Sequence, residues 1–294
     1  MSLVHQTTSG PGLGTFRILV IGDIVGQPGR DIVRKVVPIL RRAENISFVV
    51  ANAENAAGGS GLTRACYDEL IGAGVDCLTM GDHVYCRKEI LQFIDEEKRL
   101  VRPANYPREA PGRPFTILET PDHIPVAVLC VVGRIFMNPA NCPFEAIENV
   151  LATLPEQVRC IIVDVHAEAT AEKQMLARCF DGRVTAVLGT HTHVPTADEQ
   201  ILPGGTAFQC DLGMTGPHES IIGRKIDPVV LKARTFRPTN FSVATDDVRL
   251  NGAVIEVDVK TGLAVGIRRL RVDWDQAERL RTEFLASSDR KSGS

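Results

Sequence analysis

Short, nearly unbroken apolar runs alternate with helix-like segments over most of the chain, and this alternation limits the fold more than any other feature. Six runs have the length of strands and contain few polar residues, as expected for strands that are covered on both faces. They lie at 16–21, 47–51, 77–80, 126–132, 160–165 and 185–188. The pattern predicts an α/β protein with right-handed crossovers between its strands.

Five periodic stretches between these runs predict helices. They span 29–42, 63–73, 87–97, 144–154 and 171–180. Pro38 lies inside the first stretch, where its ring and its missing N–H group are expected to kink or split the helix.

The pattern changes after about residue 198. Two stretches, 200–210 and 252–272, each place a turn between β-rich segments and predict β-hairpins. Asp227 followed by Pro228 predicts the cap of a short helix at 229–236. The end of the chain, 276–294, predicts a polar helix with a Ser/Gly-rich tail.

No low-complexity linker or internal repeat divides the chain, so we expect one domain over 16–275 after a disordered leader at 1–15. The leader lacks the basic start and apolar stretch of a secretion signal. No apolar run approaches the ~20 residues that a membrane span needs. Eight separated cysteines without a CxxC pair indicate reduced thiols, and we therefore expect a cytoplasmic protein.

Composition excludes several classes of protein. Of the 294 residues, 44% are hydrophobic and 23% are charged, as in ordinary globular proteins. The net charge of −3 gives no electrostatic footprint for long nucleic acid or for an acidic membrane. Only 5% of the residues are aromatic and no basic stripe is visible, so RNA binding is poorly supported.

Five of the six apolar runs lead directly into residues that can bind metal. In an α/β sheet the carboxyl ends of the strands line one crevice, and ligands bind there. The residues concerned are Asp23, Glu54, Asn55, Asp82, His83, His166, His191 and His193.

Each of these residues has a structural explanation when taken alone. Asp23 could be a turn or cap residue, and His166 could be a hydrogen-bonded core histidine. The pair His191 and His193 is harder to explain in this way, because residues two apart in an extended segment share a face. Their joint occurrence on successive strand ends favours a metal site.

The chemistry of the set narrows the choice of metal. Imidazole, carboxylate and amide groups without a convincing thiolate suit manganese, iron or zinc, and not a structural zinc or an iron–sulfur cluster. Seven candidate ligands are too many for one tetrahedral ion. Two ions about 3.5–4 Å apart that share a carboxylate would use them all.

Six motifs resemble those of the calcineurin-like metallophosphoesterases. Within these, the chain is most similar to the bacterial branch of 2′,3′-cyclic-nucleotide phosphodiesterases, which includes a biofilm-regulating member from Bacillus. The resemblance covers 16–275 and implies a two-sheet β-sandwich flanked by helices. The motifs are GDIVGQPGR (22–30), NAENAAGG (52–59), RPANYP (102–107), DVHAEAT (164–170), GTHTHVPTAD (189–198) and DLGMTGP (211–217).

The resemblance also implies two metal ions per chain, with iron or manganese favoured and zinc as an alternative. Glu54 would bridge the two ions, and His83 would be the proton donor. The other ligands would be Asp23, Asn55 and His193 for one ion, and Asp82, His166 and His191 for the other. The implied reaction is hydrolysis of a small cyclic nucleotide by a metal-bridged hydroxide.

Asp82 departs from the family, which usually has asparagine at this position. With Asp23 and Glu54 it brings three negative charges to two divalent ions, so a net charge of +1 remains where asparagine would leave +2. A bridging hydroxide then brings the net charge to zero. This should weaken the attraction for a phosphodiester, or favour a trivalent ion such as Fe³⁺.

Several further residues are weaker candidates, each with an ordinary structural alternative. The loop 58–61 could bring backbone N–H groups to a phosphate, and 213–218 could form a flexible rim. Arg102 and Asn105 could contact substrate. Arg134 and Glu168 could hold ligand histidines.

Other functions remain open at this point. A phosphomonoesterase or 5′-nucleotidase would use the same metal ligands, and a non-catalytic regulator could retain the metal without hydrolysis. A dinucleotide-binding loop at 22–30 is disfavoured, because the glycine spacing is not GxGxxG and Pro28 has no N–H group to donate. The chain could also form a homo-oligomer.

Overall fold

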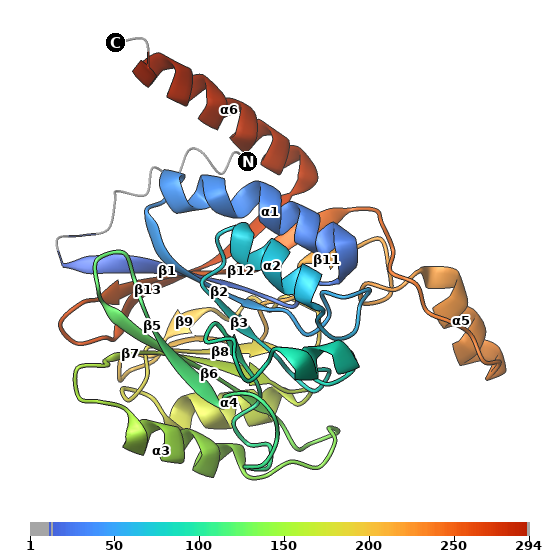
Figure 1. The fold of residues 1–294 in the computed structure, drawn as a ribbon, viewed down its shortest axis with the longest axis horizontal. Coiled ribbons are helices and arrows are strands. Elements are labelled where there is room, and N and C mark those ends of the chain that lie inside the picture. Colours follow the sequence, from blue (N-terminus) through green and yellow to red (C-terminus); the bar gives the residue numbers. More distant parts are fainter. Residues whose placement is uncertain (1–11, 13, 293–294) are drawn as a thin grey trace.

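Two β-sheets lie face to face, and helices cover their outer sides (Figure 1). The computed structural model describes residues 12 and 14–292, with side chains as far as residue 283. Most of the expected leader therefore lies outside the described residues. The architecture confirms the predicted α/β two-sheet sandwich flanked by helices.

The first sheet has a parallel part and an antiparallel part. Strands β1 to β4 run parallel to one another, and β12 pairs antiparallel with β1, β11 and β13. The strands are β1 (Thr15–Ile21), β2 (Ile46–Asn52), β3 (Cys77–Thr79), β4 (Leu100–Val101), β11 (Gly216–Pro217), β12 (Val248–Asp258) and β13 (Ala264–Asp273).

The second sheet is built around four parallel strands. Its order is β5-β6-β7-β8-β10-β9, in which β5 and β9 are antiparallel to their neighbours. The strands are β5 (Phe115–Glu119), β6 (Pro125–Val132), β7 (Cys160–His166), β8 (Ala186–Thr190), β9 (Gln200–Ile201) and β10 (Ala207–Gln209). The two predicted hairpins are present, as β9–β10 and β12–β13.

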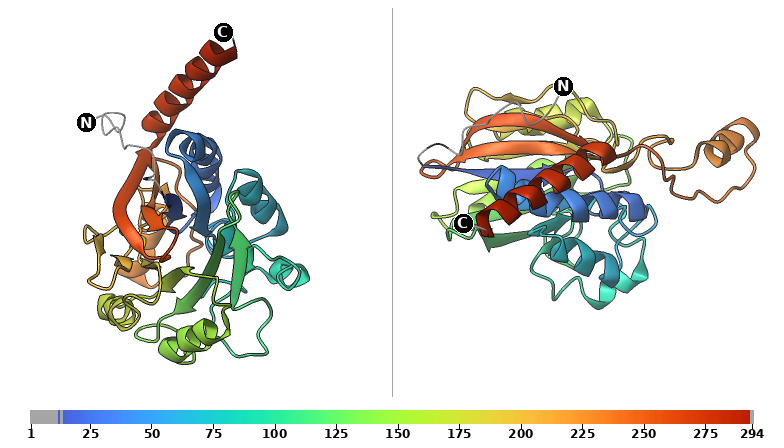
Figure 2. Two further views of the ribbon diagram at one scale, coloured as in Figure 1. Left: turned by 90° about the vertical axis from the view of Figure 1, so that its left-hand side faces the viewer. Right: turned by 90° about the horizontal axis from the view of Figure 1, so that it is seen from above.

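Helices pack on the outside of each sheet, as two further views show (Figure 2). The first sheet is covered by α1 (Gly26–Ala43) and α2 (Arg64–Gly72), and the second by α3 (Pro143–Thr153) and α4 (Thr170–Cys179). The last helix, α6 (Trp274–Ser292), begins beside α1, and α5 (Ile226–Thr235) projects away from the body of the protein. No helix among the described residues is both long and apolar enough to cross a membrane.

Burial on both faces explains why the strand sequences are nearly unbroken apolar runs. In β1, Ile18 and Val20 face the core between the two sheets, where Val128 of β6 also lies. Leu19 and Ile21 of the same strand face the core under α1 and α2. Alternate residues of one strand therefore belong to two different cores, and both sets must be apolar.

Three details differ from the sequence predictions. The stretch 87–97 contains only a short 3-10 helix, η2 (Lys88–Gln92), although Ile90 and Phe93 are buried at helical spacing. Helix α1 continues through Pro38, which lies on its exposed face, where water can satisfy the freed carbonyl. Helix α5 begins at Ile226, so Asp227 lies in its first turn and does not cap it.

Candidate metal centre

The predicted ligands meet at one edge of the sandwich, where strands of both sheets end. Strands β1, β2 and β3 lead into the carboxylates, and β7 and β8 lead into the histidines. The convergence therefore needs both sheets. The structure brings together Asp23, Glu54, Asn55, Asp82, His83, His166, His191 and His193.

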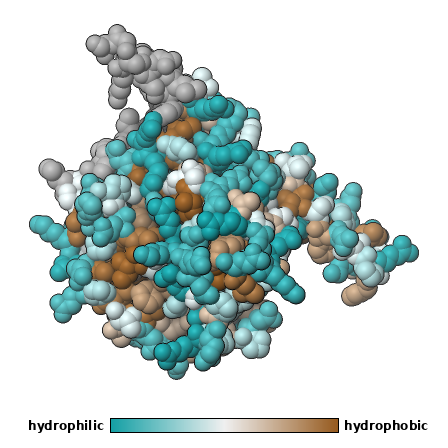
Figure 3. Space-filling model, in the orientation of Figure 1, coloured by the Kyte–Doolittle hydropathy of each residue, from teal (hydrophilic) through white to brown (hydrophobic). Residues whose placement is uncertain are grey.

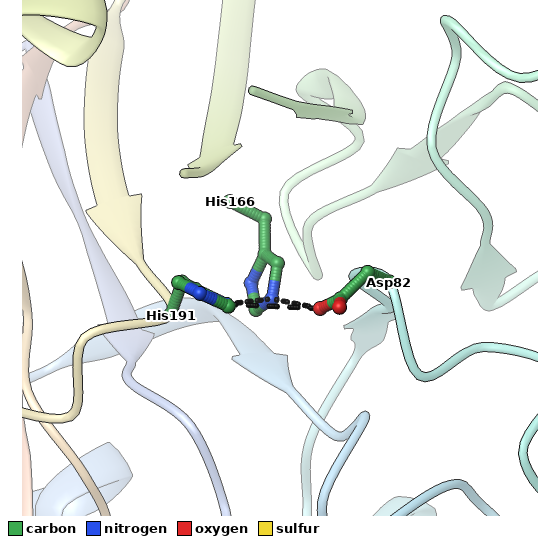
Figure 4. A group of neighbouring side chains, drawn as sticks. All are labelled: Asp82, His166 and His191. Carbon is green, nitrogen blue, oxygen red and sulfur yellow. Dashed lines mark hydrogen bonds and ion pairs between the residues drawn. The ribbon is translucent and has the colours of Figure 1, made fainter. Parts of the chain in front are cut away.

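His166 lies at the middle of the cluster and is fully buried. Its Nε2 atom is 3.1 Å from Oε2 of Glu54 and 3.1 Å from Oδ1 of Asp82. The Nδ1 atom of His191 lies 3.1 Å from the same nitrogen. Figure 4 shows Asp82 and His191 pointing at His166 from two sides.

A hydrogen-bond chain behind His166 fixes which of its nitrogens carries a proton. Nδ1 lies 2.8 Å from the hydroxyl oxygen of Thr190, which donates its proton to Oδ1 of Asp164 at 2.6 Å. Because that proton is used, the hydroxyl must accept one from Nδ1. The Nε2 atom of a neutral His166 then presents a lone pair to the cluster.

Asp164 is itself held firmly. Its other oxygen accepts from the Thr79 hydroxyl at 2.6 Å and from the Asn52 amide at 3.1 Å. Burial raises the pKa of this carboxyl. The chain Asp164–Thr190–His166 was not predicted from the sequence, although a carboxylate inside the apolar run of β7 was a signal for it.

His191 is oriented by Glu168, as the sequence suggested. Its Nε2 atom lies 3.3 Å from Oε2 of Glu168, while Nδ1 faces His166. The two imidazole rings meet edge to face, with an interplanar angle of 79°. Two imidazole nitrogens that face each other at 3.1 Å repel unless a proton or a cation lies near both.

Glu54 and His83 form a second group of contacts beside the first. The backbone N–H of His83 donates to Oε2 of Glu54 at 3.0 Å, and the amide of Asn55 donates to Oε1 at 2.9 Å. Burial works to raise the pKa of Glu54, but the contacts with His166 and His83 outweigh it and hold the pKa well below its usual range. The hydrogen bond to Glu54 raises the pKa of His83.

The carboxylate of Asp23 is fully buried, and only one of its two oxygens accepts a hydrogen bond from the described residues. Oδ2 accepts from the backbone N–H of His191 at 3.1 Å, but Oδ1 has no hydrogen-bond partner among the described residues. Burial raises the pKa of Asp23 to about 7. Two imidazole nitrogens lie 3.9 Å from Oδ1, Nε2 of His193 and Nδ1 of His166.

His193 is held by Ile222, which lies between β11 and α5. Its Nδ1 atom donates to the backbone carbonyl of Ile222 at 3.0 Å, so a neutral ring presents Nε2 toward Asp23. Burial lowers the pKa of His193, which keeps the ring neutral. Asn55 lies beside it, with its amide nitrogen 3.3 Å from Nε2.

The arrangement around His191 and His193 differs from the predicted extended pair. Both residues have left-handed backbone conformations, with φ of 94° and 65°. They therefore do not share a strand face, and His191 turns to His166 while His193 turns to Asp23. Buried Asp211 holds this loop in place. Its carboxylate accepts hydrogen bonds from the backbone N–H and the hydroxyl of Thr192, and it forms an ion pair with Lys173 at 2.7 Å.

Gly81 is required by the close approach of the two groups. A Cβ atom at this position would overlap the carboxylate of Glu54 and the imidazole of His166. A side chain here would therefore push β3 away from the ligands. From the sequence alone, this glycine is only part of the strand end.

The weaker candidates turn out to have structural roles. The N–H groups of Gly59, Ser60 and Gly61 donate to carbonyls of their own loop, so they do not form a phosphate cradle. Arg102 and Asn105 are buried and bond to backbone groups of neighbouring loops.

Two further expectations are also corrected. The segment 213–218 is largely buried and contains β11, which pairs with β12, so it is not a flexible rim. Arg134 is exposed, and its backbone N–H group donates to the carboxylate of Glu172. This contact does not involve a ligand histidine.

The donor set fits divalent cations. Carboxylate oxygens and imidazole nitrogens from Asp23, Glu54, Asp82, His166 and His191 form groups of three whose atoms lie within 4.8 Å of one another. Buried Asp23 has an oxygen without a partner among the described residues, and His166 offers a lone pair from a fixed tautomer. Mixed oxygen and nitrogen ligands of this kind suit manganese, iron and zinc.

A two-sheet sandwich with carboxylates and histidines gathered at its strand ends defines the metallophosphoesterase class. Two solved structures share it. One is a hypothetical protein from Thermus thermophilus, with 40% identity, a TM-score of 0.81, and coverage of 88% of this chain and 99% of that one. The other is a novel phosphatase from Mycoplasma pneumoniae, with 32% identity, a TM-score of 0.83, and coverage of 88% and 94%.

Within this class, the chain belongs to the family of YmdB-like proteins, whose model matches residues 19–270. It is 44% identical over 260 residues to a 2′,3′-cyclic-nucleotide 2′-phosphodiesterase of Bacillus subtilis, covering 88% of this chain and 98% of that protein. It is 31% identical to a putative phosphatase/phosphodiesterase of Mycoplasma genitalium, covering 93% and 99%. The resemblance found from the motifs is thereby confirmed.

Proposed function

We propose that this protein is a metal-dependent phosphodiesterase that hydrolyses 2′,3′-cyclic nucleotides with two metal ions per chain. Two observations in combination support the proposal. The ligand side chains converge beside His83, and they do so in a chain 44% identical to a phosphodiesterase named for this substrate. When bound, the ions supply a hydroxide nucleophile from water and offset negative charge on the phosphoryl group.

The ligands divide into two sets that share Glu54. Asp23, Asn55 and His193 would hold one ion with it, and the other ion would be held by Asp82, His166 and His191. Glu54 is suited to bridge, because its two oxygens face different groups: Oε1 faces Asn55 and Oε2 faces His166. We propose iron or manganese as the resident metal, with zinc as the alternative.

His83 would protonate the departing ribose oxygen. Its Nδ1 atom lies 2.9 Å from the Asn55 side-chain oxygen and 3.2 Å from Oε1 of Glu54, so this nitrogen is the one that both acceptors hold. Nε2 is then left for the substrate, and the side chain is 38% exposed. An alkoxide is a poor leaving group, so a proton supplied here speeds bond cleavage.

These roles determine which bonds form and which break in the reaction. Water adds to phosphorus, the bond between phosphorus and the ribose 2′-oxygen breaks, and His83 gives its proton to that oxygen. The product is the nucleoside 3′-phosphate, and the histidine recovers its proton from the water. This choice of bond is taken from the name of the Bacillus relative.

The test is hydrolysis of 2′,3′-cyclic AMP by metal-stripped protein after addition of Mn²⁺, Fe²⁺ or Zn²⁺. In the variant His83→Asn, the amide nitrogen can keep the contact of Nδ1 while the proton-donating Nε2 is lost. We expect metal-dependent formation of 3′-AMP that falls about 10²–10⁴-fold in this variant at unchanged metal content.

A matched control is His123→Asn. His123 is 87% exposed and has a left-handed conformation (φ 61°) that asparagine accepts, so its turnover should equal that of the wild type. Metal uptake without turnover on any phosphate ester would favour a non-catalytic regulator. Absence of metal uptake would contradict the site itself.

Phosphomonoesterase activity is the second candidate. It is favoured by the Mycoplasma pneumoniae structure, which is described as a phosphatase, and by the putative phosphatase/phosphodiesterase of Mycoplasma genitalium. Comparison of 3′-AMP and 5′-AMP with 2′,3′-cyclic AMP as substrates separates the two activities, because a phosphomonoesterase releases inorganic phosphate from the monoesters.

We also propose a single metallophosphoesterase domain over 16–275 and a cytoplasmic location. The core between the two sheets contains residues from β1 to β13, including Phe16 and Ile267 at its margins, which supports one folding unit. All eight cysteines are free thiols, which fits a reducing compartment.

A further inference from the structure

The loop 133–142, here called the β6 loop, leaves the second sheet beside the proposed metal centre and leads into α3. Val132, the last residue of β6, pairs with His166 of β7, and the backbone N–H of Gly133 donates to the His166 carbonyl at 2.9 Å. Phe136 follows Val132 by four residues, so the Cα atoms of the two residues are at most about 14 Å apart. The first half of the loop therefore lies close to a proposed metal ligand.

Two buried polar side chains anchor the β6 loop. Near its start, the carboxylate of Glu172 in α4 accepts a hydrogen bond from the backbone N–H of Arg134 at 2.9 Å. Asn105 joins the two ends of the loop, because its amide nitrogen donates to the carbonyl of Val132 at 2.8 Å and to that of Asn141 at 3.0 Å. Neither anchor belongs to the proposed ligand set. The loop is thus held in one position from two sides.

Asn105 also connects the β6 loop to a tyrosine near the ligands. The next residue, Tyr106, has its ring centroid 6.3 Å from that of Tyr85, which follows Asp82 by three residues. Burial raises the pKa of Tyr106, and the negative charges of Asp82 and Glu54 raise it further. Because such effects of charge fall with distance, the Tyr106 ring lies near two proposed ligands. The loop is therefore attached to the surroundings of the metal centre.

Phe136 is exposed at the surface of this anchored loop. The face shown in Figure 3 is largely hydrophilic, with apolar patches between the charged groups. Among the large apolar side chains that the structure describes, only Phe236 is as exposed as Phe136, which is 88% exposed. Phe136 also has a left-handed backbone conformation, with φ of 61°, which is strained for a bulky residue. Strain of this kind is concentrated at ligand sites, where the surrounding structure maintains it.

Arg134 adds a positive charge to the same loop. Its side chain is exposed, and no carboxylate in the described part of the chain lies within ion-pair distance of its guanidinium. Proteins that bind single-stranded nucleic acids combine aromatic rings, on which bases stack, with positive charge that attracts the phosphates. The β6 loop offers both groups beside a site proposed to take an anionic nucleotide.

We propose that Phe136 is a specificity-determining residue, on which the base of the substrate stacks while its cyclic phosphate lies at the metal ions. This inference rests on the proposed phosphodiesterase function and adds the part of the site that distinguishes a nucleotide from other phosphodiesters. Every base has an aromatic face, so the ring accepts all four bases. Anchoring by Asn105 and Glu172 positions the ring before the substrate arrives, which reduces the cost of ordering the loop.

The test compares a substrate that has a base with one that lacks it. The two substrates are 2′,3′-cyclic AMP and the 2,3-cyclic phosphate of 1-O-methylribose, each with the Mn²⁺-loaded full chain. In Phe136→Asn we expect the KM for 2′,3′-cyclic AMP to rise on the order of tenfold at nearly unchanged kcat, because the base loses its stack and the reacting groups are untouched. The KM for the base-free substrate should not change.

His123→Asn is the matched control for Phe136→Asn. His123 precedes β6 and so lies at the other end of that strand, its side chain is 87% exposed, and its φ is also 61°. Asparagine accepts this conformation at both positions, and the control should keep the wild-type KM for both substrates. Phe136→Trp retains an aromatic ring and should keep the low KM for 2′,3′-cyclic AMP. A KM that is unchanged in Phe136→Asn, or that rises equally for both substrates, would overturn the proposal.

Calorimetric titration of the same proteins with 3′-AMP separates this inference from the proposed function. A wild-type chain that hydrolyses neither substrate would contradict the phosphodiesterase function. In that case, a dissociation constant for 3′-AMP that rises on the order of tenfold in Phe136→Asn would still support stacking of a base on this residue. Equal binding of 3′-AMP by the two proteins, or no binding by the wild type, would overturn it.

Discussion

At the scale of single residues, Asp82 would set the charge of the proposed metal centre. Its Oδ1 atom lies 3.1 Å from Nε2 of His166 and 3.6 Å from Nδ1 of His191, so the carboxylate occupies the place of a ligand. Burial works to raise the pKa of Asp82, but the contacts with His166 and His191 keep it well below its usual range. The group therefore brings a full negative charge to the site.

We predict that Asp82→Asn raises turnover of 2′,3′-cyclic AMP with Mn²⁺, on the order of tenfold, because one more positive charge remains to attract the phosphodiester. The same change should weaken retention of Fe³⁺ relative to Mn²⁺, since a carboxylate favours the more highly charged ion. Turnover is compared at equal metal occupancy, measured by elemental analysis. Unchanged or lower turnover at that occupancy would contradict the charge argument.

Thr190 offers a prediction about the residue behind a ligand. Thr190→Val keeps the shape of the side chain but removes the hydroxyl that joins His166 to Asp164. Affinity for Mn²⁺ should fall about 10–100-fold, because the ring loses its fixed tautomer and orientation. Calorimetric titration measures the change.

The control for Thr190→Val is Thr116→Val. The Thr116 hydroxyl donates to the Lys98 carbonyl in another part of the second sheet, and its loss should leave metal affinity unchanged. Equal losses of Mn²⁺ affinity in both variants would show a general effect of removing a hydroxyl. They would contradict the specific role of Thr190.

The convergence of the candidate ligands could be predicted from the sequence because each follows a strand, whereas the residues that support them could not. His166 and Asp164 are two residues apart, but Thr190 joins them only because β7 and β8 pair in a register that sets His166 opposite Thr190. Ile222 holds His193 through a backbone carbonyl, which carries no side-chain signal at all. Such contacts depend on the three-dimensional arrangement.

At the scale of elements, long apolar strands are predictable and short ones are not. The six predicted strands all exist within one or two residues of their expected ends. β4 has two residues, Leu100–Val101, and is a strand only because β3 lies beside it. In the stretch 87–97, apolar residues at helical spacing indicated a helix, but the chain mixes i+3 hydrogen bonds, such as Phe93 to Ile90, with separate i+4 bonds, such as Ile94 to Ile90.

The loop after β8 depends on the buried ion pair between Lys173 of α4 and Asp211. We predict that Lys173→Met lowers the free energy of unfolding by about 3–5 kcal/mol, because the Asp211 carboxylate then stays buried without its cation. Urea denaturation gives this difference. Adding Asp211→Asn to Lys173→Met should recover part of the loss, since the remaining buried charge is removed, and a double variant no more stable than the single one would contradict this account.

At the scale of the whole molecule, metal and stability should be linked. Three acidic groups, Asp23, Glu54 and Asp82, lie together at the edge where both sheets end, and bound cations favour the folded state that assembles them. Saturation at about 1,000 times the dissociation constant adds about 4 kcal/mol. For a chain of this size, chelation should lower Tm by on the order of 10 °C.

Differential scanning fluorimetry of metal-loaded, chelated and reloaded protein measures this effect. Reloading with Mn²⁺ should restore the original Tm, whereas Mg²⁺, which prefers oxygen ligands, should restore little of it. An unchanged Tm after chelation, with metal loss verified by elemental analysis, would mean that the ligands are assembled without help from a cation.

The carbonyl of Ile222 should give the two proposed ions different residence times. His166 is supported from inside the second sheet by Thr190 and Asp164, whereas His193 is supported by Ile222 of the arm, the segment 219–244 that carries α5 and lies outside both sheets. Each excursion of the arm would release the ligand of one ion and leave the other undisturbed. Exchange of the bound metal for an isotope of the same metal should therefore proceed in two phases, with the ion at His193 replaced first. The rate at which the arm moves would set the rate of the faster phase.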